Sequence, residues 1–273
     1  MAMVIATVNS LPSISNITLP QTLASLEQSL TSGLNLSANL TTSNAEAVIE
    51  NCGEAFIDVR MRVSQARNIA LRAYGDSHLG VTSAHGFRAM FKDRTAIAAV
   101  GTFLRNIYEL RAKGGLNPHP GTYLEPRIAC ATENMAARYD YLHLGYDPWQ
   151  RCLTHTPEGI FPPAFYAEGT AYIFLCPVYN IQAPIPLRSH CPSVVESDNV
   201  FVGNQNLFYR QYQVYTLIYY LTRFYLGDFA LGANTHPREQ IDWNDCVFNL
   251  NILESIRNPT NMQLYMARKS FPL

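Results

Sequence analysis

Apolar residues recur at helical spacing over residues 45–73, and polar residues fill the positions between them. This period predicts a long helix, because side chains three and four apart lie on the same face. Asn44 is suited to cap its start, and Gly75 lies where it should end. The same spacing predicts a short helix that begins near Ser83 and a longer one over 95–113.

A further segment, residues 202–226, carries apolar side chains on all sides of a predicted helix. A helix of this kind is buried in a core. Gly227 is placed to end it. Neither histidine, cysteine nor carboxylate occurs between Val200 and Gly227, so the helix lacks the usual metal ligands. The pattern predicts two more helices, over 243–256 and 261–269.

The remaining segments predict loops and a small β layer. Residues 117–163 are rich in proline, glycine and tyrosine, which is typical of loops and short strands, and the β-branched and aromatic run 170–175 predicts a strand. Residues 1–43 form a Ser/Thr/Asn-rich arm. The order of the elements predicts a helix-dominated α+β fold, with one domain over residues 44–273.

The composition narrows the class of protein. Of 273 residues, 15% are charged, which is below the usual quarter. The net charge is −1 and the basic residues are scattered, so we expect no nucleic-acid-binding face. The apolar runs stay shorter than the roughly 18 residues that a membrane span needs, so we expect none. The first 15 residues make a poor signal peptide, and we interpret the sequence as a mature form.

The cysteines and glycosylation motifs indicate a secreted protein. The six cysteines include no C-x-x-C pair, and an even number at wide spacing suits three disulfides in an oxidising compartment. Six buried thiols in a cytosolic protein are the alternative. N-glycosylation motifs begin at Asn16, Asn35 and Asn39 and favour secretion, to the extracellular space or the cell wall.

A resemblance to a known family rests on three pieces in the same order. These are the F-x-x-x-F step from Phe87, the run Thr170–Ile181 followed by a Pro-rich stretch to Cys191, and the closing segment Asn258–Ala267. Together they resemble two related groups of secreted fungal zincin-like proteins, the deuterolysin-type metalloendopeptidases and the pH-regulated antigen or zincophore family. The resemblance implies a deuterolysin-like, zincin-like domain. It also implies three disulfides, Cys52–Cys130, Cys152–Cys176 and Cys191–Cys246.

The resemblance also places the zinc ligands of those families, and this chain lacks them. The H-E-x-x-H of the deuterolysins aligns with residues 219–223, and the H-R-x-x-H of the zincophores aligns with residues 222–226. The second alignment fits better, because it keeps Arg223. It makes Thr222 and Leu226 the former zinc positions, and neither side chain can replace histidine.

The third ligand position is partly kept. Asp245 stands where these families carry an aspartate ligand, and Asp242 lies one turn before it. A pair of aspartates without nitrogen or sulfur ligands holds zinc weakly in water. In the first alignment Tyr220 replaces the general base, and a phenol is a poor base near neutral pH. If the old cleft survives, its expected lining residues are Tyr219, Tyr220, Arg223, Tyr225 and Asp242. The plainer interpretation of these tyrosines is core packing.

These observations lead to an expected function with two alternatives. We expect a secreted glycoprotein that resembles a metallopeptidase but is a pseudoenzyme, with no catalytic residue and no cofactor. It would act by binding an extracellular protein or glycan at the cell surface, in the matrix or on a host. The first alternative is an active zinc metalloendopeptidase with a rearranged site, with zinc as its cofactor. The second is a structural extracellular protein that self-associates through the arm and the tyrosine-rich face.

Overall fold

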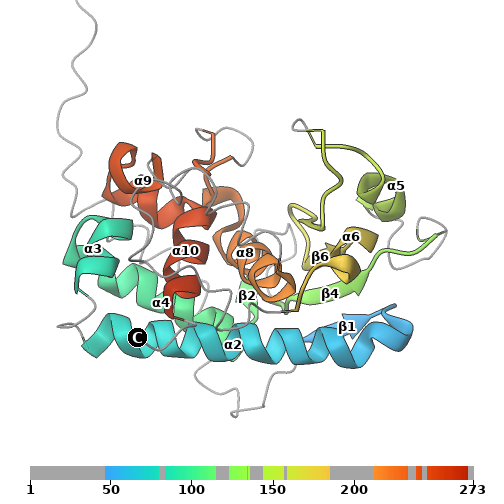
Figure 1. The fold of residues 1–273 in the computed structure, drawn as a ribbon, viewed down its shortest axis with the longest axis horizontal. Coiled ribbons are helices and arrows are strands. Elements are labelled where there is room, and N and C mark those ends of the chain that lie inside the picture. Colours follow the sequence, from blue (N-terminus) through green and yellow to red (C-terminus); the bar gives the residue numbers. More distant parts are fainter. Residues whose placement is uncertain are drawn as a thin grey trace, which may run out of the picture.

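A computed structural model gives the fold of the chain. It describes residues 47–79, 84–114, 123–133, 135, 144–156, 159–184, 212–232, 238–241 and 245–269. The described residues form an α+β fold that is rich in helix, with a small mixed sheet and two disulfides. The helices fill one end of the molecule and the sheet lies at the other, with one long helix running beneath both (Figure 1). The predicted arm and its three glycosylation motifs lie outside the described residues.

The long helix is α2 (Phe56–Leu79). It begins later than the predicted start at residue 45, because Val48–Glu50 forms strand β1 instead. Asn51 and Gly53 both adopt a positive φ between the strand and the helix, so the chain cannot continue as one helix through them. The buried face of α2 packs against α4 (Ile97–Glu109), as amphipathic spacing in both segments predicts.

The sheet has the order β1-β4-β6-β5. Strands β1, β4 (Arg127–Cys130) and β6 (Tyr172–Leu175) are parallel, while β5 (Ala164–Tyr166) is an antiparallel edge strand. The predicted strand over 170–175 is therefore confirmed as β6. All four residues of β6 are buried, since helices cover one face and a second apolar cluster covers the other.

Smaller elements make up the rest of the regular structure in the described residues. They are η2 (Gly53–Ala55), α3 (Ala84–Phe91), η3 (Arg94–Ala96), β2 (Lys113–Gly114), β3 (Tyr123–Leu124), α5 (Pro148–Cys152), α6 (Pro177–Ile181), η7 (Gly227–Phe229), η8 (Asp245–Asn249), α9 (Ile252–Arg257) and α10 (Pro259–Lys269).

The central helix is α8 (Gln213–Leu226), which packs against α2, α4, α10 and β5. It is the segment that the sequence predicts to be buried, and it ends where Gly227 adopts a positive φ. The single helix predicted over 243–256 is wrong. That stretch contains the π-helical turn η8 and then α9, because Asn251 and Glu254 form a capping box that starts a new helix.

Two disulfides fasten the sheet to its neighbours. Cys52–Cys130 joins the segment before α2 to the end of β4, and Cys152–Cys176 joins α5 to the residue after β6. Both pairs are among the three that the resemblance implies. The third implied pair, Cys191–Cys246, is wrong: Cys246 is a buried thiol whose Sγ donates to the carbonyl of Gln240 at 3.3 Å, and Cys191 lies outside the described residues. None of the described helices combines the length and the apolar character that crossing a membrane requires.

Candidate functional site

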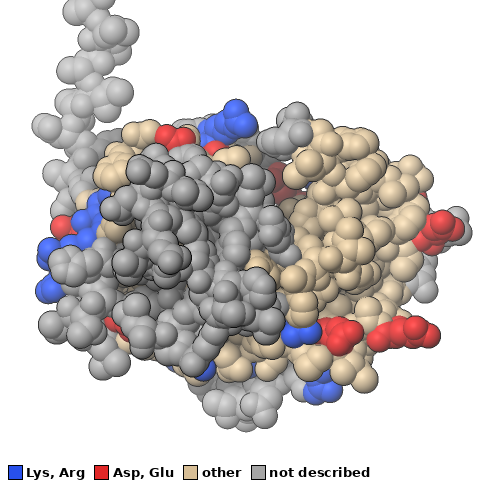
Figure 2. All heavy atoms as spheres, viewed as in Figure 1, with Lys and Arg blue, Asp and Glu red and all other residues tan. Residues whose placement is uncertain are grey.

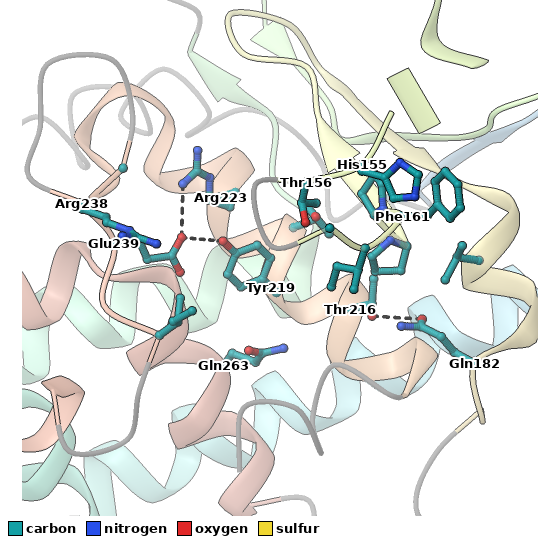
Figure 3. A pocket seen from close by; sticks show the side chains of 18 residues that line it. His155, Thr156, Phe161, Gln182, Thr216, Tyr219, Arg223, Arg238, Glu239 and Gln263 are labelled. Carbon is teal, nitrogen blue, oxygen red and sulfur yellow. Dashed lines mark hydrogen bonds and ion pairs between the residues drawn. The ribbon is translucent and has the colours of Figure 1, made fainter. Parts of the chain in front are cut away.

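A pocket of about 910 Å³ opens over one flank of α8 (Figure 3). Its walls come from the segment that leads into β5, from α6, from α8 and from residues 238–241. The described lining residues are His155, Thr156, Gly159, Ile160, Phe161, Pro162, Pro163, Val178, Gln182, Thr216, Tyr219, Tyr220, Arg223, Gly232, Arg238, Glu239, Ile241 and Gln263.

The flank of α8 that faces the pocket is set by helical spacing. The lining residues of α8 follow one another at helical spacing, so they share one face: Thr216 is followed three and four residues later by Tyr219 and Tyr220, and Arg223 comes one turn after these. They come from the least apolar stripe of an otherwise buried helix. Of the expected cleft residues, the structure therefore brings Tyr219, Tyr220 and Arg223 together in the pocket lining.

The proposed former zinc positions lie in the core instead. Thr222 and Leu226 are fully buried, and the Thr222 hydroxyl donates to the carbonyl of Ile218 at 2.8 Å. Tyr225 is also buried on the core side, where its hydroxyl donates to the carbonyl of Arg111 at 2.9 Å. Tyr225 thus belongs to the core, as the plainer interpretation of the tyrosines holds, and the expectation that it lines the cleft is wrong.

The polar floor of the pocket is organised around Glu239. One carboxylate oxygen accepts from the Tyr219 hydroxyl at 2.5 Å and lies 3.5 Å from the guanidinium of Arg223. The other oxygen accepts from Thr260 at 2.7 Å. The guanidinium also lies 3.1 Å from the carboxylate of Glu168. Side chains from α8, α10 and two loops therefore form one connected network, and Figure 3 marks the contacts of Glu239 with Tyr219 and Arg223.

The backbone beside this network is closely packed. Arg223 also donates to the carbonyl of Leu231 at 3.2 Å. The next residue, Gly232, has φ +79°, and a Cβ there would lie 3.2 Å from the Cβ of Glu239. Glycine satisfies both the backbone conformation and the close approach. The loop after α8 is thereby held against the residues that carry the network.

The network fixes the protonation of two of its members. Burial, together with the charge of Glu239, raises the pKa of Tyr219 well above its ordinary value. For Arg223 burial acts to lower the pKa, but Tyr219, Glu239 and Glu168 outweigh it and the pKa is raised. Tyr219 therefore stays a neutral hydrogen-bond donor at physiological pH and Arg223 stays charged. Neither group can serve there as a general base.

The donor set does not fit a zinc ion. Tyr219 and Arg223 stand one turn apart and converge with a carboxylate, but a protonated phenol and a guanidinium offer no lone pair of the kind that zinc prefers. Asp245 lies on η8, which packs against α3, and accepts from Asn249 at 2.5 Å. Asp242 lies outside the described residues. Within the described ranges, no three His, Cys, Asp or Glu side chains come together as a metal-binding group.

Several residues of the pocket and of the network beside it carry no signal in the sequence. Glu239 lies 16 residues beyond Arg223 and joins the site only because the chain returns over α8. Glu168 comes from the turn between β5 and β6, and Thr216 sits one turn before the aligned metal motif. The one available clue is the first alignment, which places its two histidine positions on Tyr219 and Arg223.

Comparison with known protein families and with curated proteins finds no match to this chain.

Proposed function

We propose that this chain is a secreted, non-catalytic protein on a zincin-like frame, which acts by binding through the pocket over α8. One observation carries the proposal. Tyr219 and Arg223, one turn apart on the helix that follows the sheet, converge with the carboxylate of Glu239 at the pocket floor. Two helix residues at i and i+4 plus a third acidic group is the arrangement a helix-borne zinc site needs. In this chain the same three positions hold a hydrogen bond from Tyr219 to Glu239 and an ion pair between Arg223 and Glu239.

The arrangement of elements around the pocket supports the zincin-like frame. The helix α8 packs against the antiparallel edge strand β5, and the segment before β5 forms one pocket wall. The disulfides Cys52–Cys130 and Cys152–Cys176 are two of the three pairs that the resemblance to secreted fungal proteins implies. Disulfides also suit an extracellular protein. On this proposal the first alignment, over residues 219–223, is the structurally equivalent one.

The chemistry of the same residues supports the absence of catalysis. Tyr220 stands at the position of the general base, and a tyrosine in its neutral form abstracts no proton from water at physiological pH. The Glu239 carboxylate already accepts from Tyr219 and Thr260 and lies beside Arg223. The groups that would activate a water in a zinc peptidase are therefore replaced here by side chains that form hydrogen bonds and ion pairs with one another. Binding a host or partner molecule, at the cell surface or in the matrix, is the role we assign.

Metal analysis and a peptidase assay on the secreted protein test this proposal together. We expect far less than one zinc per chain after purification without chelator, and no cleavage of an unfolded protein substrate such as casein. About one zinc per chain, with cleavage that a chelator abolishes, would overturn the proposal in favour of the metalloendopeptidase alternative. The Glu239→Gln variant is the control, because chelator-sensitive activity from this pocket would fall with it.

A further inference from the structure

The charges at the pocket floor neutralise one another. Arg223 lies between the carboxylates of Glu168 and Glu239, at 3.1 and 3.5 Å. Arg238 is also part of the lining, so two cationic and two anionic side chains stand at or beside the pocket. Because Arg223 is already paired and only about 15% exposed, an entering anion would have to displace a carboxylate to reach it.

The walls of the pocket are apolar and partly exposed at the mouth. Ile160, Phe161 and the two prolines that follow form one side, and Val178 and Ile241 contribute elsewhere. Ile160 and Phe161 keep 49% and 41% of their surface exposed, and the centroids of the Phe161 and His155 rings lie 4.0 Å apart. The described surface over the sheet end of the molecule is mostly uncharged on the face in Figure 2. An apolar ligand surface would bury these side chains favourably.

One lining residue, Thr156, also carries a polar atom that has no partner among the described residues. The Thr156 hydroxyl oxygen is buried and makes no hydrogen bond to them. Its side chain belongs to the same wall of the pocket as His155 and Phe161 (Figure 3). A buried polar group left unpaired costs on the order of 1–3 kcal/mol, and because this oxygen is closed off from solvent, a ligand reaches it only if the side chain turns toward the pocket. This hydroxyl can both donate and accept, so it selects no ionic partner.

We infer that the pocket binds an uncharged, partly apolar small molecule. Its volume of about 910 Å³ lies within the range of roughly 300–1,000 Å³ that ligand sites occupy. The ligand places its apolar face on Ile160 and Phe161. This inference rests on the proposed function, because it treats the pocket over α8 as the binding site.

Two fluorescent probes of nearly the same shape test the ligand class. N-phenyl-1-naphthylamine is uncharged, and 8-anilino-1-naphthalenesulfonate adds one sulfonate to the same rings. We expect the neutral probe to bind the native protein saturably at one site. The sulfonate probe should bind at least about tenfold more weakly, because burying its charge costs desolvation and the buried Arg223 is already paired with Glu168 and Glu239. Equal or tighter binding of the sulfonate probe would overturn the inference.

Variants locate the binding and test the role of charge. Phe161→Ala is expected to weaken the neutral probe about fivefold or more, whereas Leu153→Ala, at an exposed residue outside the lining, leaves it unchanged. Glu168→Gln removes one partner of Arg223 from outside the lining, so we expect tighter binding of the sulfonate probe with the neutral probe unchanged. Circular dichroism confirms that each variant is folded.

The outcomes separate the two proposals. A native protein that binds neither probe, or whose binding ignores Phe161→Ala, contradicts the ligand class and leaves the metal and peptidase assays to decide the function. Stoichiometric zinc with chelator-sensitive cleavage contradicts the proposed function, whatever the probes do. Selective binding of the neutral probe, lost in Phe161→Ala and kept in Leu153→Ala, supports the inference.

Discussion

Tyr219 and Thr222 are three residues apart on α8, yet they have opposite roles. Tyr219 lines the pocket and donates to Glu239, while Thr222 is fully buried and donates to the backbone of its own helix. In the same way, Arg223 lines the pocket and Leu226 lies in the core. Individual residues on this helix therefore affect either binding or stability, according to the side on which they lie.

Substitutions on the core side should change stability and leave the pocket intact. We expect Leu226→Ala to lower the free energy of unfolding by about 2–5 kcal/mol, because it leaves a cavity in a closed core. Thr222→Val should change it by less than about 1.5 kcal/mol, since the lost hydrogen bond is to a helix carbonyl. Urea unfolding measures both. Loss of neutral-probe binding in a fully stable Leu226→Ala protein would contradict this assignment.

The buried tyrosines should make stability fall at high pH. Burial raises the pKa of Tyr225 well above its ordinary value, so the folded protein holds a proton that the unfolded chain releases near pH 10. The sign follows from the raised pKa: the stabilisation is complete below about pH 10 and is lost as the pH rises further.

Tyr225→Phe tests this pH dependence. We expect a loss of about 1 kcal/mol at pH 7, where the hydrogen bond to the Arg111 carbonyl is missing, and a smaller decline in stability between pH 9 and 11 than in the parent protein. Urea unfolding at several pH values gives the comparison. An unchanged decline would mean that Tyr225 ionises as readily in the folded protein as in the unfolded chain.

At the scale of elements, the pocket depends on how the segment before β5 is held. Cys152–Cys176 ties α5 to the end of β6, and the wall residues follow α5 directly. Cys52–Cys130 lies at the other side of the sheet, between the start of the helical layer and β4. Both crosslinks restrict the unfolded chain, but only the first adjoins the pocket.

Removing each disulfide should therefore have different effects. Replacing both Cys52 and Cys130 by serine removes the crosslink that closes a loop of 78 residues, and should cost about 4 kcal/mol of stability with probe binding kept. Replacing both Cys152 and Cys176, across a loop of 24 residues, should cost about 3 kcal/mol and also weaken the neutral probe. Equal probe affinity in the two folded variants would contradict a role for α5 in shaping the wall.

Across the whole molecule, sequence patterns predict the elements better than they predict the site. Helical spacing locates α2 and α4, and the run of β-branched and aromatic residues locates β6. The start of α2 is misplaced because Val48 and Ile49 fit a helical period as well as a strand, and only pairing with β4 decides between them. Such pairing is a long-range contact that local spacing does not encode.

The orientation of α8 is beyond sequence reasoning for a related reason. A helix that is apolar all round shows no preferred face, so the two alignments with the metal motif cannot be separated by periodicity. The packing of β5 and of residues 238–241 around the helix sets which side faces the pocket. Glu239 also joins the site through long-range packing, and no local sequence motif predicts its position there.

Zinc affinity of a variant with two histidines tests the central claim most directly. With Tyr219→His and Arg223→His, the pocket floor should bind zinc through both imidazoles and Glu239, and adding Glu239→Ala should weaken that affinity at least about tenfold. The matched pair Thr222→His and Leu226→His should lose stability without gaining such a site. Isothermal titration with zinc that finds the Glu239-dependent site in the first pair supports the account, and one that finds it only in the second contradicts it.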